Sequence, residues 1–146
     1  MPEPIQITSK SGLNYTVANA VFCPEPALSE RRAIHESGAW RWNPGRLIKA
    51  WWGDPGRIGM AHWEPADFCG DPAASYALRQ KMRAEGWAYT ASISSSGRVY
   101  TQFYRYGNGG AMEFGNGDST DECVSFALAA LRALGVEFEL VEGWDK

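Results

Sequence analysis

The stretch between residues 71 and 135 constrains the fold most, because it is predicted to contain two helices with three strands between them. The first of these helices has a recognisable residue at its start and at its end. Asp71 is a typical helix cap, because its carboxylate accepts hydrogen bonds from the free N–H groups of the first turn. Pro72 suits the first helical position, where its missing N–H leaves no hydrogen bond unmade. Gly86 supplies the left-handed conformation at which helices commonly end. We therefore expect a helix between Asp71 and Gly86.

A second helix is predicted to open with the sequence Ser119-Thr-Asp-Glu122. In this capping-box pattern the Ser119 hydroxyl and the Glu122 carboxylate each accept from a backbone N–H at the start of the helix. Apolar residues then recur at helical spacing until Gly135, which is expected to end the helix. Each of the two helices thus has its own start and stop signals, and together they flank the segment from Gly86 to Ser119.

Between the two helices the side-chain period changes to two, which indicates β-strands. Strands are expected over 89–93, 99–104 and 111–114, separated by turns rich in Ser, Gly and Asn. Residues 136–140 follow as a fourth strand, and the acidic residues that alternate along it favour a place at an edge of the sheet. The chain is therefore predicted to be α+β, with a helix–three antiparallel strands–helix core, a fourth edge strand and an N-terminal Trp-rich α/β extension packed on it.

The N-terminal half is expected to contribute shorter elements. Segments 5–8 and 14–17 are predicted to pair as a hairpin across a Ser/Gly turn. Short helices are expected over 27–36 and 43–53, the second because Asn43-Pro44 resembles a cap followed by a first turn. Residues 58–63 read as a strand.

Composition limits the class of protein but not its activity. The 146 residues are 45% hydrophobic and 21% charged, which is typical of a soluble globular protein, and the formal net charge of -3 favours no class of partner. No linker or internal repeat divides the chain. We therefore expect one compact domain over 1–146, made of an N-terminal Trp-rich subregion, 1–70, and an αβββα(β) subregion, 71–146.

Targeting and cysteine signals favour a cytoplasmic protein. No basic start followed by an apolar run marks a signal peptide, and no apolar stretch is long enough to cross a bilayer, so no membrane partner is expected. The 3 cysteines are widely spaced and odd in number. We interpret them as reduced, mostly buried thiols, because structural disulfides are rare in reducing compartments.

Five of the 7 tryptophans fall between Trp40 and Trp63, with basic residues interleaved. Tryptophan buries a large area, so the simplest interpretation is that these rings form core. The alternative is a binding surface, because aromatic rings and arginines together anchor protein interfaces or stack bases and hold phosphates. The candidate partner-binding residues in this segment are Trp40, Trp42, Arg46, Trp51, Trp52 and Arg57.

A second candidate surface lies on the predicted sheet. If Val99, Thr101 and Phe103 face the helices, then Tyr100 and Tyr104 lie on the opposite face together with Tyr106. The N-terminal half is the expected cover for this face, since most domains have two packed layers or more. Left uncovered, the face would be a recognition surface.

No pattern in the sequence predicts a catalytic or metal centre. His62-Trp-Glu64 matches one half of a zinc deaminase site, but the Pro-Cys-x-x-Cys half is missing. No Cys or His pair has the short spacing of zinc ligands, and no phosphate-binding loop is present. We therefore expect no catalytic residue, no metal and no cofactor, and an enzyme that uses Cys69 or His62 is kept only as an alternative.

The helix–three strands–helix order is also that of double-stranded RNA-binding domains. Those domains hold phosphates with lysines at the start of the last helix. Here residues 118–122 read Asp-Ser-Thr-Asp-Glu, and these acidic groups would repel phosphate. The topology alone therefore gives little support for binding to duplex RNA.

Two segments resemble a phage family. The run from Ala73 to Trp87, with its Arg-Ala-Glu-Gly-Trp ending, and the closing helix Asp121-Glu-Cys-Val-Ser-Phe-Ala-Leu-Ala-Ala-Leu131 resemble the phage α-β-α sandwich domain. The likeness covers residues 71–136 and does not extend to the tryptophan-rich half. It implies an accessory protein of a phage or prophage, expressed in a bacterial cytoplasm, and it brings no catalytic residues.

The sequence therefore favours a protein that acts by binding. The leading hypothesis is a phage-type accessory protein, without enzymatic activity, that binds a protein partner such as a host factor or a defence component. The second is a nucleotide or nucleic-acid binding module that uses the tryptophans with their neighbouring arginines. The binding hypotheses require that Trp51 and Trp52, or Tyr100 and Tyr104, be accessible to solvent.

Overall fold

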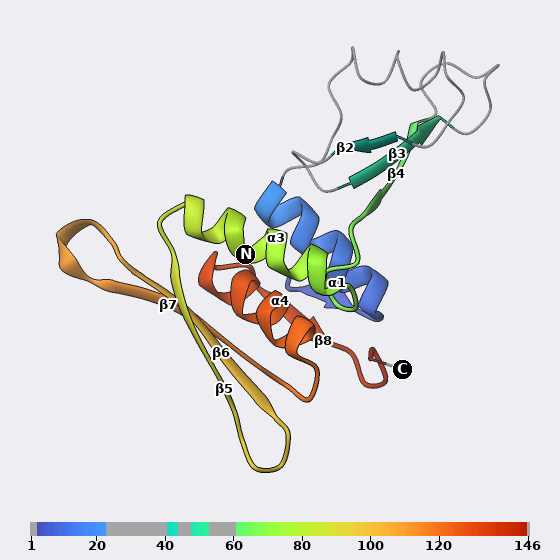
Figure 1. Cartoon of the computed structure of the whole chain (residues 1–146). Coiled ribbons are helices and arrows are strands. Elements are labelled where there is room, and N and C mark those ends of the chain that lie inside the picture. Colours follow the sequence, from blue (N-terminus) through green and yellow to red (C-terminus); the bar gives the residue numbers. More distant parts are fainter. Residues whose placement is uncertain (1–2, 23–40, 44–47, 53–60, 146) are drawn as a thin grey trace.

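In a computed structural model of the chain, residues 3–22, 41–43, 48–52 and 61–145 are described, and the structural statements below concern these residues (Figure 1). The N-terminal elements are β1 (Ile5–Ile7), α1 (Lys10–Val17), the π-helical turn η1 (Ala18–Phe22), β2 (Arg41–Asn43), β3 (Ile48–Trp52) and β4 (Ala61–Pro65). The C-terminal elements are α3 (Pro72–Ala84), β5 (Ala88–Ile93), β6 (Val99–Tyr106), the 3₁₀ turn η2 (Asn108–Gly110), β7 (Met112–Ser119), α4 (Glu122–Ala133) and β8 (Phe138–Leu140).

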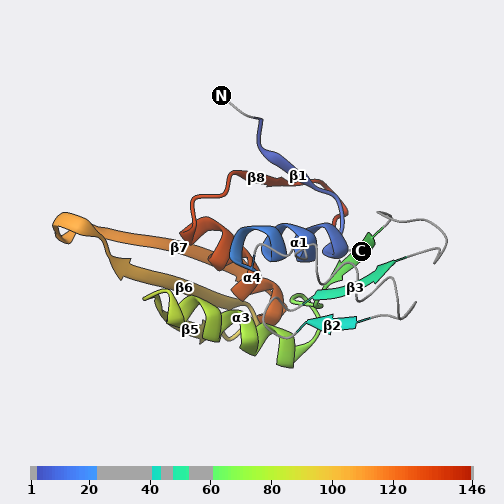
Figure 2. The ribbon, with the colours of Figure 1, turned by 90° about the horizontal axis from the view of Figure 1, so that it is seen from above.

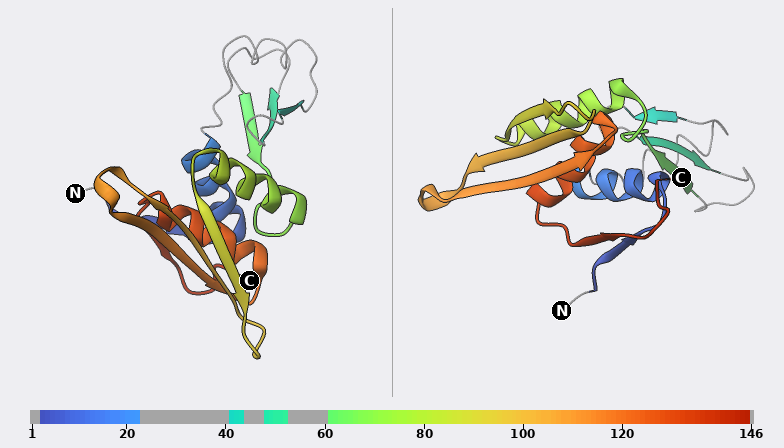
Figure 3. Two further views of the ribbon diagram at one scale, coloured as in Figure 1. Left: turned by 60° about the vertical axis from the view of Figure 1, so that its left-hand side comes forward. Right: turned by 90° about the horizontal axis from the view of Figure 1, so that it is seen from below.

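The main sheet is antiparallel, with β6 between β5 and β7. Helix α4 packs on one face of it, over β6 and β7, and α1 and α3 pack in turn against α4 (Figures 1 and 3). The hairpin of β6 and β7 extends past the end of this helical layer, with η2 at its tip (Figure 2). The helices therefore lie on one side of the sheet and leave its other face for solvent or a partner.

Two smaller sheets complete the described fold. Strands β1 and β8, from opposite ends of the chain, pair in parallel, and Figure 2 shows this pair beside α1, on the side opposite α3. Strands β2, β3 and β4 form a separate antiparallel sheet. None of the helices described has both the length and the apolarity that a bilayer crossing requires.

The core surrounds α4, which is buried between the sheet on one side and β1, α1 and α3 on the other, and three aromatic rings pack on its sheet side. Phe103 of β6 and Phe126 of α4 are almost fully buried, with ring centroids 6.1 Å apart. Tyr89 of β5 packs edge-on against both, at 5.6 and 5.3 Å. Such edge-to-face pairs add to the stabilisation that comes from burial alone. The guanidinium of Arg79, from α3, stacks over the Phe126 ring at 4.4 Å from its centroid, and this contact joins α3 to the cluster.

Helix α4 approaches β7 so closely that the strand needs glycine at two alternate positions. A Cβ atom at Gly117 would overlap the backbone O of Ser125, and one at Gly115 would overlap the backbone N of Ala133. Residues two apart on a strand face the same way, so both glycines point at the helix. The pattern Gly-x-Gly therefore sets the distance between helix and sheet.

The structure confirms the α+β class and the helix–three strands–helix core. Helix α3 begins after Asp71, whose carboxylate accepts from the N–H of Ala73 at 3.0 Å, and its chain turns at Gly86 with a positive φ. Strands β5 and β6 lie where the period-two pattern predicts them. These elements are specified locally, by caps, turns and side-chain period.

Two N-terminal predictions are wrong. Residues 14–17 belong to helix α1 and not to a hairpin, because the Ser9 hydroxyl caps a helix by accepting from the N–H of Gly12 at 3.0 Å. Residues 48–52 form β3 and not a helix, in agreement with the preference of Ile and Trp for strands. The strand expected over 58–63 is present as β4, shifted towards the C-terminus, and the helix expected over 27–36 lies outside the described residues.

Three C-terminal predictions also need correction. The cap of α4 is Asp121, whose carboxylate accepts from Cys123 N at 2.9 Å, whereas Ser119 ends β7 and accepts from Asp121 N. Strand β7 continues to Ser119 instead of stopping at residue 114. The fourth strand, β8, is present, but it pairs with β1 and not with the main sheet. In each case the local pattern has several solutions, and a contact distant in sequence selects one.

Candidate functional site

The candidate site is the face of the β5–β6–β7 sheet that points away from the helices. Along β6, Val99, Thr101 and Phe103 are buried against the helical side, as predicted. Because side chains alternate along a strand, Tyr100 and Tyr104 lie on the opposite face. We call this the outer face, and its members follow from the strand register: Ala88, Thr90 and Ser92 of β5, Tyr100, Gln102, Tyr104 and Tyr106 of β6, and Met112, Phe114, Asn116 and Asp118 of β7.

The outer face has an aromatic end and a polar end. At the aromatic end Tyr104 lies directly opposite Phe114, and Tyr106 lies opposite Met112. At the polar end Tyr100 is flanked by hydroxyl, amide and carboxylate groups from the neighbouring strands. The aromatic end coincides with the hairpin of β6 and β7 that projects beyond the helices (Figures 1 and 2).

Solvent reaches the large apolar side chains of this face. The exposed fraction is 70% for Tyr106, 54% for Phe114, 49% for Met112 and 47% for Tyr100. The expectation that the N-terminal half covers these side chains is therefore wrong. A contiguous group of exposed aromatic residues and methionine is uncommon on a protein that acts alone and is typical of an interaction surface.

Two depressions open onto this face, one at each end. The one at the aromatic end has a volume of about 750 Å³ and lies beside the turn at Gly86, lined by Tyr104 and Tyr106 together with the Arg105–Glu113 pair of the helical side. The one at the polar end, about 390 Å³, lies between Tyr100, Gln102 and Asp118. Both are open hollows, whereas sites for small molecules usually enclose most of the ligand. Their form suits the side chains of a macromolecular partner.

The cations around the outer face are engaged by the protein itself. Arg98 Nε donates to Asp118 Oδ1 at 2.8 Å, and this carboxylate raises the pKa of the guanidinium above its usual value. On the helical side of the same strands, Arg105 Nε donates to Glu113 Oε2 at 2.9 Å, and its guanidinium also stacks over the Trp87 ring at 4.2 Å. Because both arginines have carboxylate partners, the face offers little free positive charge to a phosphate backbone.

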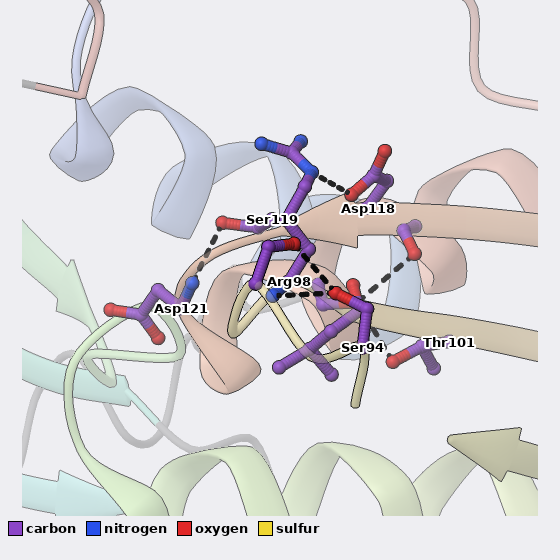
Figure 4. A network of polar contacts seen from close by, with 10 residues as sticks. Ser94, Arg98, Thr101, Asp118, Ser119 and Asp121 are labelled. Atoms are coloured by element: carbon purple, nitrogen blue, oxygen red, sulfur yellow. Dashed lines mark hydrogen bonds and ion pairs between the residues drawn. The ribbon is translucent and has the colours of Figure 1, made fainter. Parts of the chain in front are cut away.

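Polar contacts tie together the polar end of the face (Figure 4). The N–H of Arg98 donates to the Ser94 hydroxyl at 3.2 Å, which closes the turn between β5 and β6. The Arg98–Asp118 ion pair then joins this turn to β7, close to the point where Ser119 leads into the cap of α4. These bonds fix the ends of the strands relative to one another, so the face is pre-organised.

The tryptophan and arginine candidates lie in a part of the chain for which the structure gives less information. Trp40, Arg46 and Arg57 are outside the described residues. Trp42 lies in β2, and Trp51 and Trp52 lie in β3, where the backbone register pairs Trp51 with His62. Only the backbone is described there, so their role as a binding surface stays a prediction.

Cys69 is a poor candidate for a nucleophile. Its thiol is almost fully buried, and burial together with the charge of Asp67 raises its pKa to about 12. The residue is held by Asn14, whose side-chain oxygen accepts from Cys69 N at 3.0 Å and whose amide donates to Asp67 Oδ1 at 3.1 Å. A thiol that stays protonated at physiological pH reacts slowly, so this network is structural.

Metal-binding side chains do not converge in the part of the chain that the structure describes. No group of three or more His, Cys, Asp or Glu side chains is placed to hold an ion there. Cys123 is a free, half-buried thiol whose pKa is also raised, chiefly by burial. The side chain of His62 is outside the description, so a pairing with Cys69 is not addressed.

Met112 and Phe114 were missed by the sequence interpretation, although a signal for them exists. The expected third strand stopped at residue 114, before its alternation became visible. Extended to Ser119, the strand alternates Met112, Phe114, Asn116 and Asp118 on one face with Glu113, Gly115 and Gly117 on the other. The glycines mark the side of close helix packing, which places the larger residues on the outer face.

Comparison of the chain with protein-family models, with curated proteins and with solved structures finds no match.

Proposed function

We propose that the protein acts by binding a protein partner through the aromatic end of the outer face. The single observation that carries the proposal is the contiguous exposure of Tyr106, Phe114 and Met112 on a hairpin that projects beyond the helices. Tyrosine, phenylalanine and methionine are enriched in protein interfaces, where each buries a large area. The burial of these side chains against a partner would supply the main driving force.

Charge favours a protein partner over a nucleic acid. Arg98, beside the face, is paired with Asp118, and Arg105, on the helical side of β6, is paired with Glu113. Arg132, at the β7 edge, donates to the backbone O of Asn116 at 2.8 Å. Binding of a single strand needs a positively charged groove beside the stacking rings, which this face lacks. The second candidate function, nucleic-acid binding by the tryptophan–arginine segment, therefore depends on a different part of the chain.

The biological setting follows from sequence resemblance alone. Residues 71–136 resemble the phage α-β-α sandwich domain, and on this basis the partner would be a bacterial host factor or a component of a defence system. The geometry of the face bears only on the kind of contact with that partner: the aromatic end of the β6–β7 hairpin would insert into an apolar recess of the partner.

Site-specific photo-crosslinking tests the proposal. A photoreactive phenylalanine analogue at position 106 is expected to give a covalent adduct with a host protein in bacterial cells. The matched control places the analogue at Tyr76, which is 57% exposed on α3, on the helical side of the sheet. Phe114→Ser should then abolish the adduct at position 106 without unfolding the chain, because Phe114 is largely exposed.

The outcomes separate the two functions. A protein adduct at position 106, absent at position 76 and lost in Phe114→Ser, supports the proposal. Equal adducts at both positions, or none at position 106, overturn it. For the nucleic-acid alternative, a fluorescence titration at low salt with single-stranded oligonucleotides should quench tryptophan emission, and an unchanged emission would remove that option.

A further inference from the structure

Besides its outer face, the main sheet has a free edge, which is formed by β5. Strand β5 pairs with β6 on one side, and no other described strand pairs with it. Its six residues, Ala-Tyr-Thr-Ala-Ser-Ile, include no charge and no proline, and its register with β6 runs without a bulge. Charged residues, prolines and bulges on an edge strand are features by which natural proteins block unwanted strand pairing. Because β5 has none of these three, its edge is open to a further strand.

The opposite edge of the same sheet is protected. Arg132 Nη1 donates to the backbone O of Asn116, which occupies one of the outward-pointing acceptors of β7. Glu113 and Asp118 add charge along that strand, and α4 packs closely against it. Because two edges of one sheet differ in this way, β5 is the one available for pairing.

The backbone groups free on β5 follow from the hairpin. The N–H of Ser94 donates to the carbonyl of Arg98 at 2.8 Å, so these two residues form a hydrogen-bonded pair. Bonded and non-bonded pairs alternate along an antiparallel ladder. Thr90 and Ser92 therefore bond to β6, and the outward-pointing groups are those of three residues: Tyr89, Ala91 and Ile93.

From these observations we infer that β5 pairs with β5 of a second copy of this chain, antiparallel, about a two-fold axis at Ala91. In this register Ala91 faces its own copy, and Tyr89 faces Ile93 of the second copy. All three outward residues then form hydrogen-bonded pairs, each of which exchanges two bonds. A register centred on Thr90 would leave Ile93 outside the ladder.

The side chains are complementary in the same register. Thr90 lies opposite Ser92 of the second copy on the outer face, where two hydroxyls can bond to one another. Tyr89 lies opposite Ile93 on the helical side, an aromatic–β-branched pair, and both kinds of cross-strand pair are favourable. Tyr89 packs on Phe126 of α4, whereas Ile93, at the other end of β5, is 70% exposed, so the second copy would cover a side chain that is largely open to solvent.

The association joins two three-stranded sheets into one of six strands. An axis perpendicular to the sheet keeps both helical layers on the same side, and it places two outer faces side by side on the other. The inference does not depend on the proposed function, and each can fail without the other.

Analytical ultracentrifugation over about 1 μM to 1 mM tests the association. The wild type should show a concentration-dependent dimer. Ala91→Lys places two like charges opposite each other at the axis and should weaken the dimer by about tenfold or more. The matched control Ala111→Lys adds the same charge at an exposed position of the β6–β7 turn and should dimerise like the wild type. A monomer at every concentration, or an Ala91→Lys dimer of unchanged affinity, overturns the inference.

Amide hydrogen exchange tests the edge, and a double variant tests the register. The amides of Tyr89, Ala91 and Ile93 should become protected as the dimer forms, and a dimer in which they exchange rapidly overturns the inference. Thr90→Lys combined with Ser92→Glu should dimerise at least as tightly as the wild type, because lysine meets glutamate in this register. Weaker dimerisation of that variant overturns the register, since lysine would meet lysine in the one centred on Thr90.

Discussion

The Oγ atom of Ser125 lies 2.8 Å from Oγ1 of Thr101, so a fully buried hydroxyl pair joins α4 to β6. The same Oγ lies 3.0 Å from the carbonyl O of Gly117 and 3.1 Å from that of Val99. The Ser125 hydroxyl donates to Thr101 Oγ1, and because it has a single proton it shares that proton between this oxygen and the two carbonyls. This arrangement satisfies both hydroxyls at the point where helix and sheet approach most closely (Figure 4).

We expect the two hydroxyls to act as one unit in stability. Ser125→Ala should lower the free energy of unfolding by about 1–2 kcal/mol, because it also leaves the Thr101 hydroxyl without its buried partner. Thr101→Val should lower it by about 1 kcal/mol. The double variant should lose little more than the larger single loss. Urea unfolding followed by circular dichroism measures all three, and strictly additive losses would contradict the shared bond.

Gly117→Ala is expected to be among the most damaging single-methyl changes in the chain. The added Cβ would overlap the backbone of α4 at Ser125, and no side-chain rotation relieves that overlap. We expect a loss of about 3 kcal/mol or more in the free energy of unfolding. The control is Gly12→Ala in α1, where the new Cβ meets only Ser9 Oγ at 3.5 Å. That change should stabilise the protein by up to about 1 kcal/mol, since alanine favours helix. Equal effects in thermal melts would refute the close approach.

The start of α4 can be located by two cap variants. Asp121→Ala removes the acceptor for the N–H groups of Cys123 and Val124 and should cost about 1 kcal/mol of stability. Ser119→Ala removes only the acceptor for the N–H of Asp121 and should cost less. Chemical denaturation of the two variants gives the comparison, and a larger loss for Ser119→Ala would restore the capping box that the sequence suggests.

The buried thiol of Cys69 should make stability depend on pH in the alkaline range. The thiol has a pKa of about 12 in the folded protein against 9.0 for the unperturbed group. The stabilisation is therefore complete below about pH 9, and it is lost as the pH rises towards 12, because the unfolded chain releases the proton first. The slope should approach about 1.4 kcal/mol per pH unit within this window.

Cys69→Ala provides the reference for that measurement. All other groups that ionise at alkaline pH are common to both proteins, so the difference between wild type and variant isolates the thiol. Urea denaturation at several pH values above 8 should show the stability advantage of the wild type shrinking as the pH rises. A difference that stays constant with pH would show that the thiol is not held protonated.

The sequence predicted best where short-range signals suffice. Asp71 and Gly86 delimit α3 by hydrogen bonding and backbone conformation within one turn, and the alternation in β5 and β6 is visible over six residues. The tyrosines of the outer face followed from the same alternation. The cover of that face could not be predicted, because it depends on where the helices and the N-terminal half pack.

The errors arose where one local pattern fits two structures. Ser119 and Asp121 are both good caps, and the choice between them depends on how far β7 continues along β6. The segment that contains Trp51 and Trp52 fits a helix or a strand, and pairing with β4 selects the strand. For the same reason the partner of β8 depended on β1, which lies at the other end of the chain.

By itself the sequence determined the α+β class, the two helices around three strands, and the separation of tyrosines from the core-facing residues of β6. Caps, turns and side-chain period depend on residues a few positions apart, so they can be identified from a single sequence. Tertiary structure alone decided that the outer face is uncovered and that the β7 edge is protected while the β5 edge is free. Those properties depend on the docking of α4 over β6 and β7, which the two glycines and the Ser125–Thr101 contact fix across the chain.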